Sequence, residues 1–254
     1  MGYQQKLMSL PFWREITDLI SGEAEVEERR EAMRRVESYG EESMQFFLEA
    51  LEEITQKAYL DEDDTYLMVL TMWYTAYKKE TRAFPLLLQL SLKEHHLEAM
   101  SYNLEESYPY ALYYTFNGDY DLLEKMILTP DRETYAECEL IVAAVDLCYD
   151  GKVEKDRVRE TLLKLLFSSY QEDDIVMEYV CMGICIAPFP ELMPLVKVML
   201  ELEVCSNYDI CDYAEYEDLL GNDKNGTARA LFLPKAADYP LYEELEYLQP
   251  DGFE

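Results

Sequence analysis

The sequence predicts an all-α protein, arranged as a short α-solenoid of stacked antiparallel helix pairs. Three observations lead to this fold class. Apolar residues follow a helical period from about residue 43 to about residue 204, glycine and proline signals divide this region into short helices, and the segments recur about every 35 residues. A period of this length, filled by two helices, is typical of arrays in which each pair buries its apolar face against its neighbours.

The helical period is clearest in two windows, residues 155–170 and residues 173–187. In the first window the apolar residues are spaced so that they share one face of a helix, and they are Val158, Leu162, Leu165 and Leu166. No window of strand length alternates cleanly between apolar and polar residues, and the chain has only nine glycines with which to form hairpins. The pattern therefore predicts helices and not strands.

Turn and capping residues indicate where these helices begin and end. Gly118 and Gly151 each follow a polar residue able to end a helix, and glycine readily takes the positive φ that a helix stop requires. Asp119 is placed to cap the next helix. Thr129 is followed by Pro130, and a threonine cap with proline at the first helical position is a typical helix start.

The short helices open at similar sequences one repeat apart. Phe84 and Phe189 each precede a proline, and 189 − 84 = 105, which is three steps of 35. Similar openings at Asp119 and near Arg157 fall between them. The longer partners of these short helices are predicted over residues 64–77, 97–116, 131–149 and 173–187.

The sequences at the two ends of the chain differ from the repeats, so we expect the chain to be divided into three parts. Residues 1–40 are expected to form capping helices, residues 41–204 the helical-repeat domain, and residues 205–254 an acidic C-terminal arm with little regular structure. Within the arm, residues 241–248 are the one place where a short helix is expected. The N-terminal part carries a charged cluster in which glutamates alternate with Arg29, Arg30, Arg34 and Arg35.

The charge of the chain limits its possible partners. Its 53 acidic and 22 basic residues give a net charge of −31. Such a chain repels nucleic-acid phosphates and anionic membranes and attracts basic proteins. The alternative is that the charge only keeps the protein soluble. No apolar run reaches the ~20 residues of a membrane-spanning helix. The first residues lack the long apolar stretch of a signal peptide, and the six cysteines fit reduced thiols, so we expect a cytoplasmic protein.

Four cysteines raise the question of a metal site. Cys181 and Cys185 lie one helical turn apart, but structural zinc sites usually use two closely spaced pairs in tight turns. Cys205 and Cys211 have five residues between them and do not supply such a pair. Because free cysteine behaves as a small apolar residue, we expect Cys181 and Cys185 to be buried and free of metal.

Other combinations of reactive residues also fail to form a site by pattern. His95 and His96 are the only histidines, and adjacent residues on a helix point in different directions. The acids from Asp61 to Asp64 lack the spacing of a calcium loop and instead mark a helix N-terminus, where the helix dipole favours them. No nucleophile elbow or triad pattern is present. We therefore expect no catalytic activity, no cofactor and no bound metal.

Tyrosines are dense between residues 102 and 120 and stand beside glutamates. Since the second helices of successive pairs line one face of a solenoid, the helices over residues 97–116 and 131–149 are expected to share a surface. Carboxylates beside aromatic rings suit arginine side chains, which pair with the acids and stack on the rings. The residues predicted to bind a partner are Glu105, Glu106, Tyr108, Tyr110, Tyr113, Glu133 and Glu137. The alternatives are a solvated helix surface and tyrosines packed between helices.

Three motifs carry a family resemblance: Glu-Glu-Ser-Tyr-Pro-Tyr-Ala-Leu at residues 105–112, Asn-Gly-Asp-Tyr-Asp-Leu-Leu at residues 117–123, and Ala-Ala-Val-Asp-Leu-Cys-Tyr-Asp-Gly-Lys-Val at residues 143–153. With them, residues 104 to about 166 resemble a bacterial family catalogued as a domain of unknown function. Its members have HEAT-like helical repeats, and many carry a C-terminal SEC-C zinc motif. The chain lacks that motif and the family's Gly-Asp before the acidic motif. The resemblance implies the HEAT-like fold and no particular activity.

Charge, repeat pattern and missing catalytic motifs together indicate a protein-binding scaffold or adaptor with an acidic surface, whose partner is a basic protein. The alternative is an acidic nucleic-acid mimic that blocks a DNA-binding protein, because duplex DNA carries about one negative charge per 1.7 Å of axis. The acids here come in clusters separated by nearly neutral stretches, which ranks the mimic second.

Overall fold

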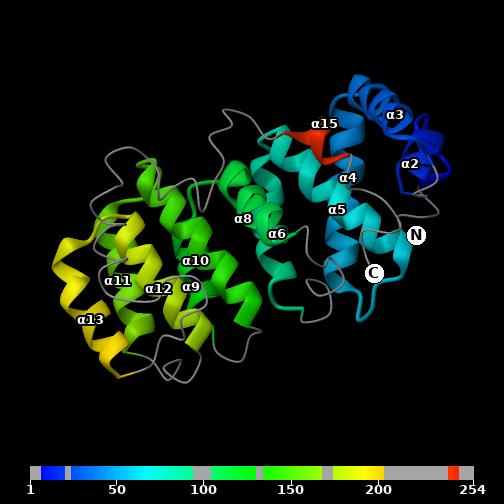
Figure 1. The fold of residues 1–254 in the computed structure, drawn as a ribbon. Helices are drawn as coiled ribbons and strands as arrows, with labels where there is room; N and C mark the ends of the chain where they lie inside the picture. The colour runs from blue at the N-terminus through cyan, green and yellow to red at the C-terminus, as the bar shows by residue number, and fades with distance from the viewer. Residues whose placement is uncertain are drawn as a thin grey trace. The chain divides into compact units, whose positions relative to one another are not determined.

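The structure is a computed structural model and describes residues 7–20, 24–93, 104–129, 134–167, 174–202 and 240–245. Within these residues the secondary structure is helical and contains no strand, which confirms the predicted all-α class (Figure 1). The chain forms two compact units, one of residues 1–117 with 236–254 and the other of residues 118–235. The division falls inside the predicted repeat region. The predicted boundaries at residues 40 and 204 stay a prediction.

The first unit contains helices from both ends of the chain. In chain order they are α2 (Trp13–Ile20), α3 (Val26–Ser38), α4 (Glu41–Gln56), α5 (Glu62–Tyr77), the 3-10 helix η1 (Thr81–Ala83), α6 (Phe84–Leu90), α8 (Leu104–Thr115) and α15 (Leu241–Glu244). Helix α5 is the centre of this unit, since it packs against α2, α4, α8 and α15. This explains why its side chains are buried on every side from Asp64 to Ala76.

The start of α5 follows from its sequence. Asp61 is the N-cap, and its carboxylate accepts a hydrogen bond from the Asp64 backbone nitrogen at 2.8 Å. The Asp64 carboxylate in turn accepts one from the Asp61 backbone nitrogen at 3.4 Å, which completes a capping box. Glu62 and Asp63 fill the rest of the first turn, where the helix dipole favours negative charge. The interpretation of these acids as a helix N-terminus is confirmed.

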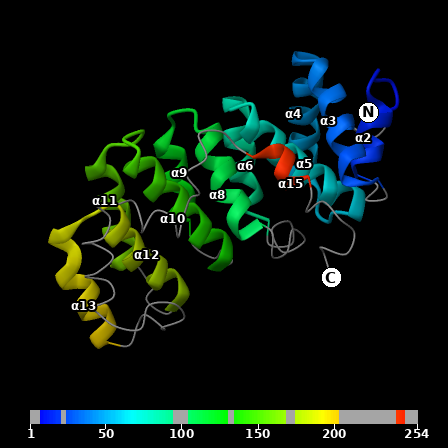
Figure 2. The ribbon, with the colours of Figure 1, turned by 45° about the horizontal axis from the view of Figure 1, so that its top comes forward.

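The second unit contains α9 (Tyr120–Ile127), α10 (Thr134–Tyr149), α11 (Lys155–Leu166), α12 (Asp174–Ile186), the 3-10 helix η4 (Pro190–Leu192) and α13 (Met193–Glu201). Helix α10 packs against α9, α11 and α12, and every residue from 136 to 148 is buried. The long helices α10 and α12 lie side by side in both views (Figures 1 and 2). Helix α5 packs against α8 in the first unit in the same way.

The structure describes most of the residues that were predicted to end or cap helices. Gly118 and Gly151 have positive φ values of 92° and 70°, and the Asp119 carboxylate accepts a hydrogen bond from the Leu122 backbone nitrogen at 3.0 Å, as predicted. The hydroxyl of Thr129 donates to the Lys125 carbonyl oxygen at 2.7 Å, on the helix that precedes it. Residues 130–133, where the next helix was predicted to begin, lie outside the described residues, so the role of Thr129 as their cap stays a prediction.

Candidate functional site

Three of the residues predicted to bind a partner have buried side chains. Tyr108 is 1% exposed, and its hydroxyl donates to the Leu87 carbonyl oxygen at 2.8 Å, while Tyr110 is buried as well. Glu137 is also buried, because neighbouring helices surround that part of α10. The expectation that these three side chains form an exposed surface is wrong.

The structure does not decide whether the other predicted residues form part of a binding surface. Tyr113 is half-buried and lies edge-on to Tyr114, with ring centroids 5.2 Å apart. Glu105 and Glu106 belong to the first turn of α8, but their side chains lie outside the description, as does Glu133. A joint surface of α8 and α10 would join the two units, so it stays a prediction.

The cysteines and histidines that were considered as metal ligands and rejected fall partly outside the described residues. Cys181 and Cys185 are fully buried, as predicted, and the Cys185 sulfur lies 3.7 Å from the sulfur of Met193. His95, His96, Cys205 and Cys211 are not among the described residues. In the part of the chain that is described, no three His, Cys, Asp or Glu side chains come together as a metal site would require.

An exposed acidic surface does occur at the turn between α4 and α5. Residues 49–64 include seven acidic residues and one basic residue, Lys57. Lys57 neutralises only Asp64, because its amine bonds to both carboxylate oxygens of that residue, at 2.5 and 2.6 Å. Asp64 is only 2% exposed, so this pair closes the inner side of the turn. The negative charge that remains lies on the outer side.

Three exposed carboxylates remain on the outer side of this turn. Glu52, Glu62 and Asp63 are exposed and form no hydrogen bond or ion pair with other side chains of the described residues. Because α4 and α5 are neighbours joined by a five-residue loop, the end of α4 and the start of α5 lie at the same end of the pair. Tyr59, in that loop, is 77% exposed. We call Glu52, Tyr59, Glu62 and Asp63 the α4–α5 acidic turn.

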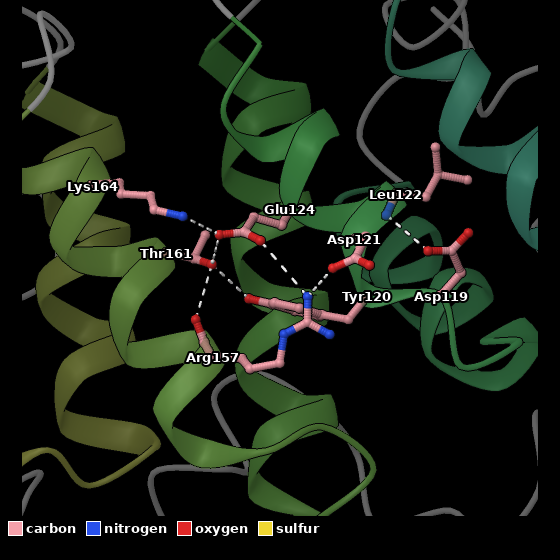
Figure 3. A network of polar contacts seen from close by, with 8 residues as sticks. All are labelled: Asp119, Tyr120, Asp121, Leu122, Glu124, Arg157, Thr161 and Lys164. Carbon is pink, nitrogen blue, oxygen red and sulfur yellow. Dashed lines mark hydrogen bonds and ion pairs between the residues drawn. The ribbon is translucent and has the colours of Figure 1, made fainter.

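A second group of charged residues, between α9 and α11, is balanced and not acidic (Figure 3). Arg157 pairs with Asp121, lies 3.8 Å from Glu124 and places its guanidinium 4.7 Å from the ring centre of Tyr120. The amine of Lys164 bonds to Glu124 at 2.6 Å. Two basic side chains therefore meet two acidic ones.

The buried side of this network ties the two helices together. The Tyr120 hydroxyl donates to the Thr161 hydroxyl oxygen at 3.0 Å, and both side chains are nearly inaccessible. Burial raises the pKa of Tyr120 far above its ordinary value, although the hydrogen bond to Thr161 opposes the shift. The tyrosine thus remains a neutral donor. The network holds α9 against α11 and leaves little unbalanced charge for a partner.

The α4–α5 acidic turn is the better candidate for binding. Carboxylates can accept charge-assisted hydrogen bonds from arginine or lysine, and an exposed tyrosine ring can stack on a guanidinium. The sequence pointed to Asp61–Asp64 only as a helix start, which holds for Asp61 and Asp64. A usable signal for the site was Tyr59, an aromatic residue in a short loop flanked by acids on both sides.

The helices were also checked for membrane-spanning length, and the chain was compared with known proteins. No helix within the described ranges has both the length and the apolar character needed to cross a membrane. No family model matches the chain, and no curated protein or solved structure matches it either. The resemblance to the bacterial family with HEAT-like repeats therefore remains a prediction.

Proposed function

We propose that the chain is a short α-solenoid scaffold that binds a basic protein partner, and that the α4–α5 acidic turn is its contact surface. The observation that carries this proposal is the exposed trio Glu52, Glu62 and Asp63, whose carboxylates lack side-chain partners among the described residues. The loop between their helices also carries the exposed Tyr59. By contrast, the carboxylates between α9 and α11 are held in intramolecular ion pairs.

The packing of successive helix pairs supports the solenoid part of the proposal. In the first unit, α4 packs on α5, α5 on α8, and α6 on α8. The second unit repeats this order, with α9 on α10, α10 on α12, and α11 on α12. In each unit the long helix of one pair thus packs on the long helix of the next, as in arrays whose repeats contact only their neighbours.

The charge of the turn specifies the chemistry of the partner. An arginine-rich segment fits best, since guanidinium groups pair with carboxylates in a fixed geometry and also stack on tyrosine. Salt weakens the attraction between exposed charges, because the Debye length is about 8 Å at physiological ionic strength and becomes shorter as salt is added. Binding should therefore weaken as salt is added.

Charge reversal tests the proposal. The variant with Glu62→Lys and Asp63→Lys and the wild type would be used to capture proteins from a native lysate at low and high salt, with identification by mass spectrometry. The binding of decaarginine to both would be measured by titration calorimetry. We expect basic proteins and decaarginine to bind the wild type at low salt, and the variant to bind at least tenfold more weakly.

A matched control changes the net charge equally at another place. Glu160→Lys with Glu201→Lys alters two exposed acids of the second unit and should leave binding within about twofold, with only the general charge effect. Equal losses in both double variants would reject the turn as the site. Failure of the wild type to bind any basic protein at either salt concentration would reject the function.

The surface first predicted on α8 is tested by a third variant. Glu105→Lys with Glu106→Lys should reduce binding if the partner contacts α8 and should have no effect if it contacts only the α4–α5 acidic turn. The nucleic-acid mimic also stays a prediction. It requires that the protein displace DNA from a bound nuclease or repressor, whereas a scaffold need not compete with DNA.

A further inference from the structure

The last described segment of the chain packs against helices near its beginning. Helix α15 lies against α5 in both overall views (Figures 1 and 2). Leu241 and Leu245, one helical turn apart, are 1% and 0% exposed. The ring of Tyr242 meets that of Tyr77 edge-on at 6.0 Å. A single helical turn is not stable alone in water, so the shape of this segment depends on its site.

Arginines of α3 bind the backbone of this segment. Arg30 donates through Nε to the Tyr242 carbonyl oxygen at 3.1 Å, and Arg29 donates to the Leu245 carbonyl oxygen at 3.1 Å. Arg29 is 3% exposed and is held by a second bond from its Nε to the Ala24 carbonyl oxygen at 2.8 Å. The last carbonyl groups of a helix have no partner within the helix and carry partial negative charge. Two guanidinium groups satisfy them here.

The side chain of Tyr242 is also bound on several sides. Its hydroxyl donates to a carboxylate oxygen of Glu37 at 2.7 Å, and Arg34 places its guanidinium 5.5 Å from the ring centre. Glu37 is itself held by an ion pair with Lys78. The site therefore distinguishes tyrosine from phenylalanine by a hydrogen bond, and aromatic from aliphatic residues by the arginine.

These contacts are those of a bound peptide: two apolar anchors one turn apart, an aromatic residue beside the first, and captured backbone carbonyls. We propose that Arg29, Arg30, Arg34 and Glu37 of α3, with Tyr77 of α5, form a recognition site for a segment with the pattern Leu-Tyr-x-x-Leu. Residues 241–245 are the intramolecular ligand of this α3–α5 site. A partner protein carrying the same pattern binds by replacing them.

Apolar anchors and backbone capture set the type of segment that fits. Helix α3 has no net charge, because its four arginines are matched by four glutamates, and Arg30 and Arg34 pair with Glu27 and Glu31. The arginines act on the segment through its backbone carbonyls and through the ring of Tyr242. The α3–α5 site thus selects a segment by its two leucines and its tyrosine, whereas the α4–α5 acidic turn selects basic segments. The two sites take different partners, and either can exist without the other.

The test uses the full chain with its own ligand weakened. The receptor carries Leu241→Ala and Leu245→Ala, and the probe is a fluorescent peptide of residues 238–248 followed by anisotropy. A tethered ligand competes at an effective concentration on the order of millimolar. We expect the peptide to bind the double variant saturably and at least tenfold more tightly than it binds the wild type. The control peptide, with both leucines changed to alanine, should bind at least tenfold more weakly than the original.

A second measurement covers the case in which the double variant folds poorly. In the wild type, the Leu245 amide donates to the Leu241 carbonyl oxygen at 3.2 Å, so hydrogen exchange reports whether the segment is docked. Excess peptide should accelerate exchange in residues 241–245 by at least threefold, and the control peptide should not. Absence of saturable binding to a folded double variant, equal binding of the two peptides, or unchanged exchange in the wild type would each overturn the proposal.

Discussion

Gly183 on α12 faces Val145 on α10 so closely that a Cβ atom on the glycine would lie 2.9 Å from Val145 Cγ2. Ile141 and Leu162 would follow at 3.8 Å. Glycine in the middle of a helix costs about 1 kcal/mol relative to alanine, so its presence there needs a reason. Close approach of the two long helices of the second unit supplies that reason.

We expect Gly183→Ala to destabilise the protein. The gain in helix propensity is about 1 kcal/mol, but overpacking a tight core contact costs about 1–3 kcal/mol, and valine is stiff at χ1 and cannot easily turn away. The net loss should be about 1 kcal/mol in urea unfolding followed by circular dichroism. Val145→Ala in the same chain should remove most of the clash, so the two changes together should cost less than their sum. A stabilising Gly183→Ala would contradict the close packing.

The sequence predicted this helical region well, because apolar spacing reports which face of a helix is buried. The burial of Cys181 and Cys185 followed from this spacing, and the stops at Gly118 and Gly151 followed from the ability of glycine to take a positive φ. The pattern does not report helices that are covered on several sides. Glu137 is buried for that reason, although its charge suggested an exposed position.

Contacts between residues far apart in the chain could not be predicted from the sequence. Arg29 and Leu245 are 216 residues apart, and nothing in either local pattern indicates that one binds the other. The short helix at residues 241–248 was expected, and α15 covers part of it, but its docking on α5 and α3 is a property of the folded chain alone. The exposure of Tyr59 likewise depends on how α4 and α5 pack.

Two helix ends with the same geometry offer a matched pair of substitutions. After α10, Gly151 has a φ of 70°, and the Lys152 nitrogen bonds to the Leu147 carbonyl oxygen at 2.8 Å. After α5, Lys79 has a φ of 53°, and the Glu80 nitrogen bonds to the Thr75 carbonyl oxygen at 2.9 Å. Only the second uses a residue with a side chain, and the left-handed region costs such a residue roughly 1 kcal/mol.

We therefore expect Lys79→Gly to stabilise the protein by about 0.5–1 kcal/mol and Gly151→Ala to destabilise it by about 1 kcal/mol. Space is not the issue at Gly151, since no described atom would lie within 4 Å of an added Cβ. Thermal unfolding of both variants at neutral pH measures the two effects. Changes of the same sign at the two sites would show that the shared backbone geometry does not determine them.

The buried thiol of Cys185 should make stability fall at high pH. Burial raises its pKa to about 12, above the ordinary value of 9.0. The folded state therefore retains a proton that the unfolded state loses, so the contribution is complete below about pH 9 and is lost as the pH rises toward 12. The slope reaches about 1.4 kcal/mol per pH unit for one proton. Cys185→Ala should flatten the wild-type curve of unfolding free energy between pH 9 and 11.

A chemical readout checks the same group independently. A thiol reagent at pH 8 should modify Cys185 only at the rate at which the second unit opens, and denaturant should accelerate the reaction. Rapid modification under native conditions, or an unchanged pH dependence in the Cys185→Ala variant, would show that the thiol is not held in its neutral form.

The hydrogen bond between Tyr120 and Thr161 predicts an unequal effect from its two partners. Tyr120→Phe removes a donor and leaves Thr161 near two other acceptors, the Arg157 carbonyl oxygen at 3.1 Å and a Glu124 carboxylate oxygen at 3.2 Å. Its cost should be about 1 kcal/mol, typical of one hydrogen bond. Thr161→Val leaves the buried Tyr120 hydroxyl without its acceptor, which should cost about 2–3 kcal/mol.

The double variant decides whether an unsatisfied hydroxyl causes the larger loss. Removing the Tyr120 hydroxyl from the Thr161→Val chain should restore stability, because an apolar pair of similar shape leaves no buried donor unpaired. Urea unfolding of the four chains forms a complete cycle. If the losses from Tyr120→Phe and Thr161→Val simply add in the double variant, the two side chains act independently, and the contact between α9 and α11 depends on the ion pairs of Arg157 and Lys164.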